Sequence, residues 1–164
     1  MDIRPTTVAD LAYVLSVEAD SDASPFIRVW SRAAHEQAIV DPNHEHLIIV
    51  DDSGPAGFVL LAGLADADAS IELRRIVVGV KNQGIGRRAL QLIIAHVFSD
   101  LKAHRLWLDV IVENERARRS YQAVGFVEEG VLREALRQAD SYASLIVMSI
   151  LRPEWEATVA TVKD

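Results

Sequence analysis

The chain has 164 residues, of which half are hydrophobic and a quarter are charged, as is usual for one globular domain. It contains no cysteine, which excludes disulfides, cysteine metal sites and thiol catalysis. The formal net charge of −7 argues against a general nucleic-acid binder, which normally carries a basic face. Because neither a secretion signal nor a membrane-spanning apolar run is found, we expect a single cytoplasmic domain over residues 1–164.

Hydrophobic periodicity and turn residues predict the elements along the chain. They are a helix at about 7–15, a helix capped by Ser24 that runs to Trp30, a hairpin of 47–50 and 57–61, a strand at 71–78, a helix with apolar positions from 90 to 101, a strand at 105–112, a helix at 114–124, a strand that opens at Phe126 and a last strand at 144–151. The tail from Pro153 is expected to be partly helical or frayed. This order indicates a mixed sheet with helices packed on its faces.

The stretch from Val77 to Leu90 holds the most informative local pattern. An apolar strand leads through a short polar loop to Gly84 and Gly86, and an amphipathic helix follows. Glycines at a strand-to-helix turn permit positive φ and let a ligand approach closely. The first N–H groups of the helix lack partners inside it and carry the positive end of its dipole. The turn is therefore a candidate cradle for phosphate oxygens.

Basic side chains gather in the middle of this acidic chain. They are Arg74, Arg75, Lys81, Arg87, Arg88, Arg116, Arg118 and Arg119. Such a local concentration suits an anionic cofactor, and the alternative for each arginine is a place on a solvated face.

A second motif runs from Asn114 to Phe126, directly after the strand at 105–112. Asn114 can cap the helix that it precedes. Ala117, Tyr121 and Val124 share one helical face, so the Tyr121 phenol points where the apolar residues point. On its own, this position also suits a half-buried structural tyrosine.

Together the two motifs resemble those of the GNAT superfamily of N-acetyltransferases, and within it the branch of ribosomal-protein alanine and spermidine acetyltransferases. The residues that carry the resemblance are Gln83-Gly84-Ile85-Gly86, the run from Asn114 to Phe126, Glu129-Gly130-x-x-Arg133-Glu134 and the stretch from Met148 to Trp155. It covers roughly residues 47–155. The resemblance implies an α/β (α+β) fold, in which a mixed, mostly antiparallel sheet is splayed between two central parallel strands and helices cover both faces.

The resemblance implies acetyl-CoA as co-substrate and no metal. The cofactor would lie where the strands at 71–78 and 105–112 splay apart, with its pyrophosphate on the amides of residues 83–88. The expected cofactor-binding residues are Ile76, Val77, Val78, Lys81, Asn82, Gln83, Gly84, Ile85, Gly86, Arg87, Arg88, Asn114, Arg118 and Tyr121. Lys81 departs from the family, which usually has arginine or glutamine at that position.

The resemblance also implies direct transfer of the acetyl group to a primary amine in a ternary complex. Glu72 would act as base through water, the Val78 N–H would bind the oxyanion, and Tyr121 would protonate the leaving thiolate. Strand alternation would place Glu72 on the face of Ile76 and Val78. The alternative for Glu72 is a surface carboxylate paired with Arg74 or Arg105.

Other titratable residues also have to be assigned to this chemistry or to the structure. Asp109, on the central strand, is a candidate for holding a cationic amine, and its alternative is a strand-end carboxylate that caps a loop. His35, His44, His46, His96 and His104 show no metal spacing and are interpreted as structural or surface residues.

The expected acceptor is a small-molecule amine or a peptide N-terminus, and neither nucleic acid nor membrane is expected as a partner. In this family the acceptor pocket lies between the first two helices and the last strands, here about residues 16–30 and 137–144. The acidic residues Glu18, Asp20 and Asp22 favour a basic amine there. Homodimers are frequent among relatives, and nothing in these residues fixes the oligomeric state.

Two other functions are compatible with parts of the sequence. An acyl-CoA-binding domain without transfer would keep the fold, although the presence of Tyr121 and Glu72 argues against it. A dinucleotide-dependent oxidoreductase would use Gly84-Ile85-Gly86-Arg87-Arg88-Ala89 as its G-x-G-x-x-A fingerprint. Against it, the fingerprint normally places its first glycine directly after the strand, whereas Lys81-Asn82-Gln83 intervene before Gly84, and a hairpin precedes that strand.

Overall fold

A twisted sheet organises the chain, and its strands and helices account for most of the residues that the computed structural model describes, which are 1–20, 26, 28–79 and 84–161. The strands are β1 (Asp2–Pro5), β2 (His44–Asp51), β3 (Gly54–Ala62), β4 (Ser70–Val78), β5 (Arg105–Ile111), β6 (Val127–Arg137) and β7 (Tyr142–Leu151). Their order across the sheet is β1-β2-β3-β4-β5-β7-β6. Only β4 and β5 pair in parallel, and the other neighbours are antiparallel. The expected mixed, mostly antiparallel sheet is confirmed.

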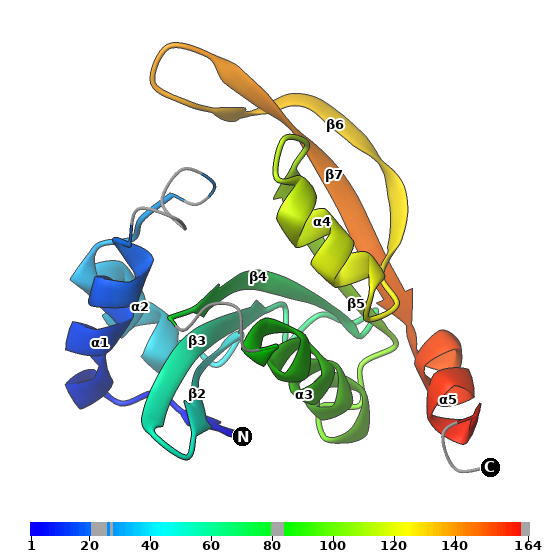
Figure 1. Cartoon of the computed structure of the whole chain (residues 1–164), viewed down its shortest axis with the longest axis horizontal. Coiled ribbons are helices and arrows are strands. Elements are labelled where there is room, and N and C mark those ends of the chain that lie inside the picture. The colour runs from blue at the N-terminus through cyan, green and yellow to red at the C-terminus, as the bar shows by residue number, and fades with distance from the viewer. Residues whose placement is uncertain (21–25, 27, 80–83, 162–164) are drawn as a thin grey trace.

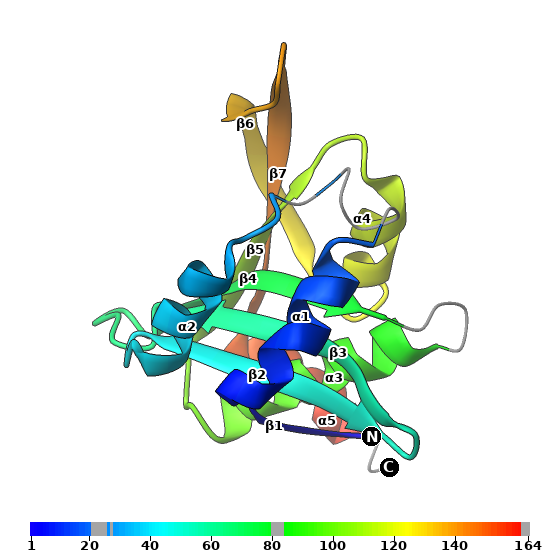
Figure 2. The ribbon, with the colours of Figure 1, turned by 90° about the vertical axis from the view of Figure 1, so that its left-hand side faces the viewer.

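Helices cover both faces of this sheet. They are a short 3₁₀ turn, η1 (Val8–Asp10), followed by α1 (Leu11–Glu18), α2 (Arg32–Val40), α3 (Ile85–Ser99), α4 (Glu115–Gln122) and α5 (Arg152–Thr161). Figures 1 and 2 show α1 and α2 on one face of β2–β4 and α3 on the opposite face. Within the described chain, no helix is long and apolar enough to cross a membrane.

The main core lies between α3 and the sheet. The apolar stripe predicted for this helix is buried, and Ile93, Val97 and Phe98 are each 0% exposed. Each such side chain contributes about 1.5–3 kcal/mol through burial. A smaller cluster on the other face joins Leu11 and Val14 of α1 to the sheet. The two clusters fix the sheet between helical layers.

The second helix begins later than the sequence suggested. α2 starts at Arg32, and the Ser31 side chain accepts a hydrogen bond from the Ala34 N–H at 3.2 Å. Trp30 therefore precedes the helix rather than belonging to it, because the serine cap at 31 sets the start. Ser24 lies outside the described residues. The short edge strand β1 was not predicted from the sequence, and the tail from 152 to 161 is helical.

The parallel pair β4–β5 is short, and this opens the sheet. The two strands pair only at Ser70 with Arg105, Ile71 with Leu106 and Glu72 with Trp107. Beyond these residues, β4 stays paired with β3 and β5 stays paired with β7. Figure 1 shows β5–β7 and α4 rising away from the β2–β4 half of the sheet. The expected splay between the two central strands is present.

Candidate active site

Two free strand edges face each other at this splay. On β4, the Gly79 N–H donates to the Ala56 carbonyl at 2.8 Å, which sets the phase of the β3–β4 ladder. Because antiparallel partners alternate between bonded and non-bonded pairs, the backbone groups of Ile76 and Val78 point away from β3. Both residues were expected to bind the cofactor, and their edge is free to accept an extended chain as an added strand.

The same alternation holds on the other side of the splay. The Val112 N–H donates to the Ser144 carbonyl at 3.0 Å, so the backbone groups of Asp109 and Ile111 point away from β7. Val77 behaves differently from its neighbours on β4, because its backbone faces β3 and its side chain is buried beneath α1. Of residues 76–78, the geometry therefore favours Ile76 and Val78 for backbone contacts with a ligand.

The glycine turn forms the N-terminus of α3. Gly84 has φ +69°, in the left-handed region, and a Cβ added at Gly84 or at Gly86 would meet no other described atom within 4 Å beyond its chain neighbours and its own helix backbone. Arg88 donates the first intrahelical hydrogen bond, to the Gly84 carbonyl at 3.2 Å. The amides of residues 85–87 therefore precede the internal ladder, and they have no hydrogen-bond partner within the described part of the chain, which suits them to an anion.

This turn fits the pyrophosphate of acetyl-CoA. Ile85 is buried and anchors the helix start, whereas Arg87 and Arg88 are exposed beside the free amides. Helix N–H groups, an open backbone and two guanidinium groups are together suited to a polyanion. Lys81, Asn82 and Gln83 lie outside the described residues.

The second motif forms α4, as predicted. The Asn114 side chain caps it by accepting from the Ala117 N–H at 3.2 Å, which leaves the Asn114 amide N–H groups as donors. Arg118 was expected at the cofactor, and its guanidinium contacts the Glu128 carboxylate at 2.9 Å and the Val112 carbonyl at 3.4 Å. These contacts brace α4 against β6, so a cofactor role for Arg118 stays a prediction.

Tyr121 lies on the inner face of α4. It packs with Ala117 and Val124 against the main core, and its ring meets Phe126 edge-on at a centroid distance of 5.7 Å. Burial, and next the Asp109 carboxylate, raise the pKa of Tyr121 to about 12. Within the described part of the chain, its hydroxyl has no hydrogen-bond partner. Tyr121 is therefore a protonated phenol with an unused donor.

A β-bulge corrects the expected orientation of Glu72. Leu60 pairs with Arg75 and Leu61 pairs with Leu73, so Arg74 is an extra residue in β4. Ile71 and Leu73 before the bulge pack in the main core, as do Ile76 and Val78 after it. Glu72 therefore faces the other side of the sheet, on which α1 and α2 lie. The prediction that Glu72 shares a face with Ile76 and Val78 was wrong, because alternation does not continue through a bulge.

Glu72 and Asp109 both lie on the α1–α2 face of the sheet. The Glu72 carboxylate accepts from Arg74 at 2.8 and 3.1 Å, so Arg74 is its partner, while Arg105 pairs with Glu129. Asp109 is exposed and alternates with the core residues of β5. Partial burial and the nearby Glu72 raise the pKa of Asp109. No ion pair or hydrogen bond of the Asp109 side chain is found among the residues described.

The histidines contribute no metal site within the described chain, where no group of three metal-binding side chains is found. His35 and His46 are buried in one hydrogen-bonded chain, whereas His96 lies between Glu45 and Asp100 at 2.8 Å from each carboxylate. His35, His46 and His96 thus each bond to neighbouring protein side chains.

A comparison with known families identifies this architecture. The model of the acetyltransferase (GNAT) family matches residues 12–126. The chain belongs to the GNAT family of acetyltransferases. It is thus an acyltransferase, and acetyl-CoA is the acetyl donor of this family. Family membership also sets aside the dinucleotide-dependent oxidoreductase.

Individual relatives fall in the branch that the sequence suggested. The spermidine N(1)-acetyltransferase of Escherichia coli (strain K12) is 27% identical over 166 residues, which cover 94% of this chain and 88% of that protein. Bacillus subtilis (strain 168) YdaF, provisionally named a ribosomal N-acetyltransferase, is 27% identical over 139 residues, covering 84% of this chain and 73% of that protein. The structure of the Vibrio cholerae spermidine N-acetyltransferase in complex with CoA and spermine superposes with a TM-score of 0.84 at 22% identity, covering 93% and 96% of the two chains. This last likeness shows the fold.

Proposed function

We propose that this GNAT protein transfers the acetyl group of acetyl-CoA directly to a cationic primary amine within a ternary complex. The observation that carries the proposal is the convergence at one splay of two strand edges, an open helix N-terminus and the Tyr121 hydroxyl, none of which has a hydrogen-bond partner there among the described residues. The cofactor supplies the acetyl group as a thioester, and the protein supplies position and protons.

On the cofactor side, backbone groups do most of the binding. The amides of residues 85–87 hold the pyrophosphate, and the edge of β4 at Ile76 and Val78 hydrogen-bonds the pantetheine arm. The Val78 N–H, which points away from β3, donates to the oxygen that gains negative charge during transfer. Tyr121 donates its proton to the leaving sulfur, and its raised pKa ensures that the proton is present at neutral pH.

On the acceptor side, two carboxylates attract an ammonium group. Asp109 binds the cation, since its side chain has no ion-pair partner among the described residues. Glu72, which is held by Arg74, takes up the proton that the ammonium loses, through water. The opposite faces of the sheet thus serve the two substrates: the pyrophosphate site at α3 lies on one face and the carboxylates lie on the other.

A polyamine is the acceptor class that these carboxylates and the named relatives favour, and a peptide N-terminus is the second. The test is an assay of CoA thiol release with acetyl-CoA and, in turn, spermidine and a peptide that begins with alanine, with mass spectrometry of the products. Release of CoA together with an acetylated amine supports the proposal. Acetyl-CoA binding without any acetylated product would instead indicate the acyl-CoA-binding domain.

A further inference from the structure

A buried chain of polar side chains joins α1, α2, β2 and β4 on the acceptor side of the sheet. Glu18 at the end of α1 and His35 in α2 are each 0% exposed, and Arg75 on β4 is 9% exposed. The Glu18 carboxylate pairs with the Arg75 guanidinium and lies 3.1 Å from His35 Nε2. From the sequence, Glu18 was expected to favour a basic amine, and Arg75 to belong to a basic group that suits an anionic cofactor. In the structure the two side chains instead pair with each other, a contact between residues far apart along the chain.

The donors of this hydrogen-bond chain all point the same way, from Thr6 toward Glu18. His35 Nδ1 lies 3.0 Å from His46 Nε2, and His46 Nδ1 lies 2.9 Å from the Thr6 hydroxyl. Burial lowers the pKa of both histidines, that of His46 to about 4, so both are neutral at pH 7. Because the Glu18 carboxylate, paired with the Arg75 guanidinium, accepts the Nε2–H of His35, His35 accepts from His46 and His46 accepts from Thr6. The chain therefore ends on Glu18 and fixes its carboxylate.

Both members of the Glu18–Arg75 pair also hold the backbone of residues 28–30. The Trp30 N–H donates to Glu18 Oε2 at 3.0 Å, and Arg75 Nη2 donates to the Arg28 carbonyl at 2.8 Å. The Arg75 guanidinium lies 4.8 Å from the centre of the Trp30 ring. Burying an ion pair is costly, and apolar side chains could fill the same space. Apolar side chains could not, however, hydrogen-bond the Trp30 N–H and the Arg28 carbonyl as Glu18 and Arg75 do.

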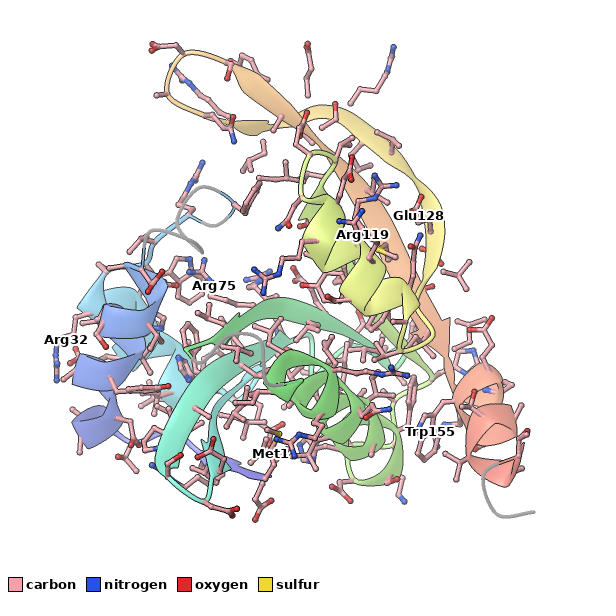
Figure 3. All side chains as sticks on the ribbon, in the orientation of Figure 1. Met1, Arg32, Arg75, Arg119, Glu128 and Trp155 are labelled. Carbon is pink, nitrogen blue, oxygen red and sulfur yellow. The ribbon has the colours of Figure 1, made fainter. Side chains whose placement is uncertain are left out.

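Residues 28–30, which Glu18 and Arg75 hold, lie beside the splay between β4 and β5. Arg75 follows the point at which β4 parts from β5, and Figure 3 shows its side chain on the inner side of the molecule, whereas Arg32 of α2 points outward. From the other direction, the Arg28 guanidinium reaches the carbonyl of Arg137, at the end of β6, with a long contact of 3.5 Å. Residues 28–30 thus extend from β4 toward the β6–β7 hairpin.

We infer that Glu18 and Arg75 are positioning residues for the acceptor amine, which fix residues 28–30 as one wall of the acceptor site. The inference rests on the proposed function and adds to it a pair of residues that contact neither substrate. Glu72 and Asp109 lie on the same face of the sheet, so displacement of this wall changes acceptor binding and leaves the cofactor cradle at α3 intact.

The test compares Glu18→Gln and Arg75→Lys with Glu36→Gln, whose carboxylate pairs with Arg32 on the exposed side of α2. Steady-state kinetics use acetyl-CoA with spermidine. Glu18→Gln and Arg75→Lys should raise the KM for spermidine by about tenfold or more, since small misplacements in a site have effects of this order, while the KM for acetyl-CoA changes by less than about twofold. Glu36→Gln should match the wild type.

Limited digestion with trypsin tests whether residues 28–30 are held in place, and it does not depend on catalysis. Cleavage after Arg28 should accelerate in Glu18→Gln and Arg75→Lys relative to cleavage after the exposed Lys102, and not in Glu36→Gln. Should Glu18→Gln fail to fold, the spermidine KM of Arg75→Lys, which keeps the charge, decides. The inference is overturned if the wild type is active and the variants keep its KM for spermidine. It is also overturned if the KM values for spermidine and for acetyl-CoA rise equally in the variants. A wild type that binds no acetyl-CoA instead overturns the proposed function, and the cleavage rates then test the wall by themselves.

Discussion

The Asp109 carboxylate on β5 lies close enough to the Tyr121 hydroxyl on α4 to help raise the pKa of that phenol. The two residues come from opposite faces of the sheet, since Asp109 alternates with the core residues of β5 and Tyr121 packs on the core side. They approach each other where β4 and β5 have parted. The splay is thus where a proton donor on the cofactor side meets a carboxylate on the acceptor side.

Asp109→Asn should weaken binding of a cationic amine. Loss of one charge-assisted contact is worth about 1.5–3 kcal/mol, or on the order of 10–100-fold in the KM for spermidine at pH 7. Because the pKa of Asp109 is raised, the wild-type KM should increase as pH falls through that raised value, and this dependence should disappear in the variant. Asp52→Asn, in an exposed hairpin turn, is the control. An unchanged spermidine KM in Asp109→Asn would remove Asp109 from the acceptor site.

Alanine substitutions at Gly84 and at Gly86 should distinguish two effects of a side chain at this turn. One is the cost of backbone strain, and the other is the loss of space for a bound ligand. Both added methyl groups point into open space, but only Gly84 has a positive φ, so only Gly84→Ala should lose about 1 kcal/mol of unfolding free energy. If the pyrophosphate lies on this turn, both variants should bind acetyl-CoA more weakly by calorimetry. Gly130→Ala, also open and far from the turn, should bind it normally. Normal binding by both turn variants would contradict the cradle.

His96 should make stability depend on alkaline pH. Hydrogen bonding to Glu45, and then to Asp100, raises its pKa to about 9. Because the folded pKa exceeds the unfolded value of about 6.5, the contribution is complete below pH 6.5 and is lost as pH rises through about 9. Urea unfolding at pH 6 and pH 10 should show a decrease of about 1–3 kcal/mol that is smaller in His96→Gln. The exposed His104→Gln is the control, and equal pH dependence in all three proteins would rule out His96 as the source.

Local patterns predicted the parts of the site that depend on neighbouring residues. The glycine turn, the Asn114 cap and the inward face of Tyr121 are encoded within single turns of helix, so spacing and capping rules find them. The short parallel pairing and the resulting splay followed from the resemblance to a family. Whether residues 1–164 form one domain stays a prediction.

Features that depend on distant contacts were not predictable in the same way. The bulge at Arg74 leaves no mark in the sequence of β4, and it reverses the face of Glu72 relative to Ile76 and Val78. The Glu18–Arg75 pair joins residues 57 positions apart, and it forms only when α1 is packed on the sheet. Trp30 was assigned to a helix because the Ser31 cap was not distinguished from Ser24.

Tyr121→Phe tests the central claim most directly. The substitution removes the hydroxyl and keeps the ring that packs against Phe126 and the core. We expect kcat for acetyl transfer to fall by about 100-fold or more, the usual contribution of a general acid, while the acetyl-CoA dissociation constant stays within about twofold. Thr158→Val, which removes an exposed hydroxyl on α5, should retain wild-type kcat. Undiminished kcat in Tyr121→Phe would contradict the account, because the proton donor would then not be Tyr121.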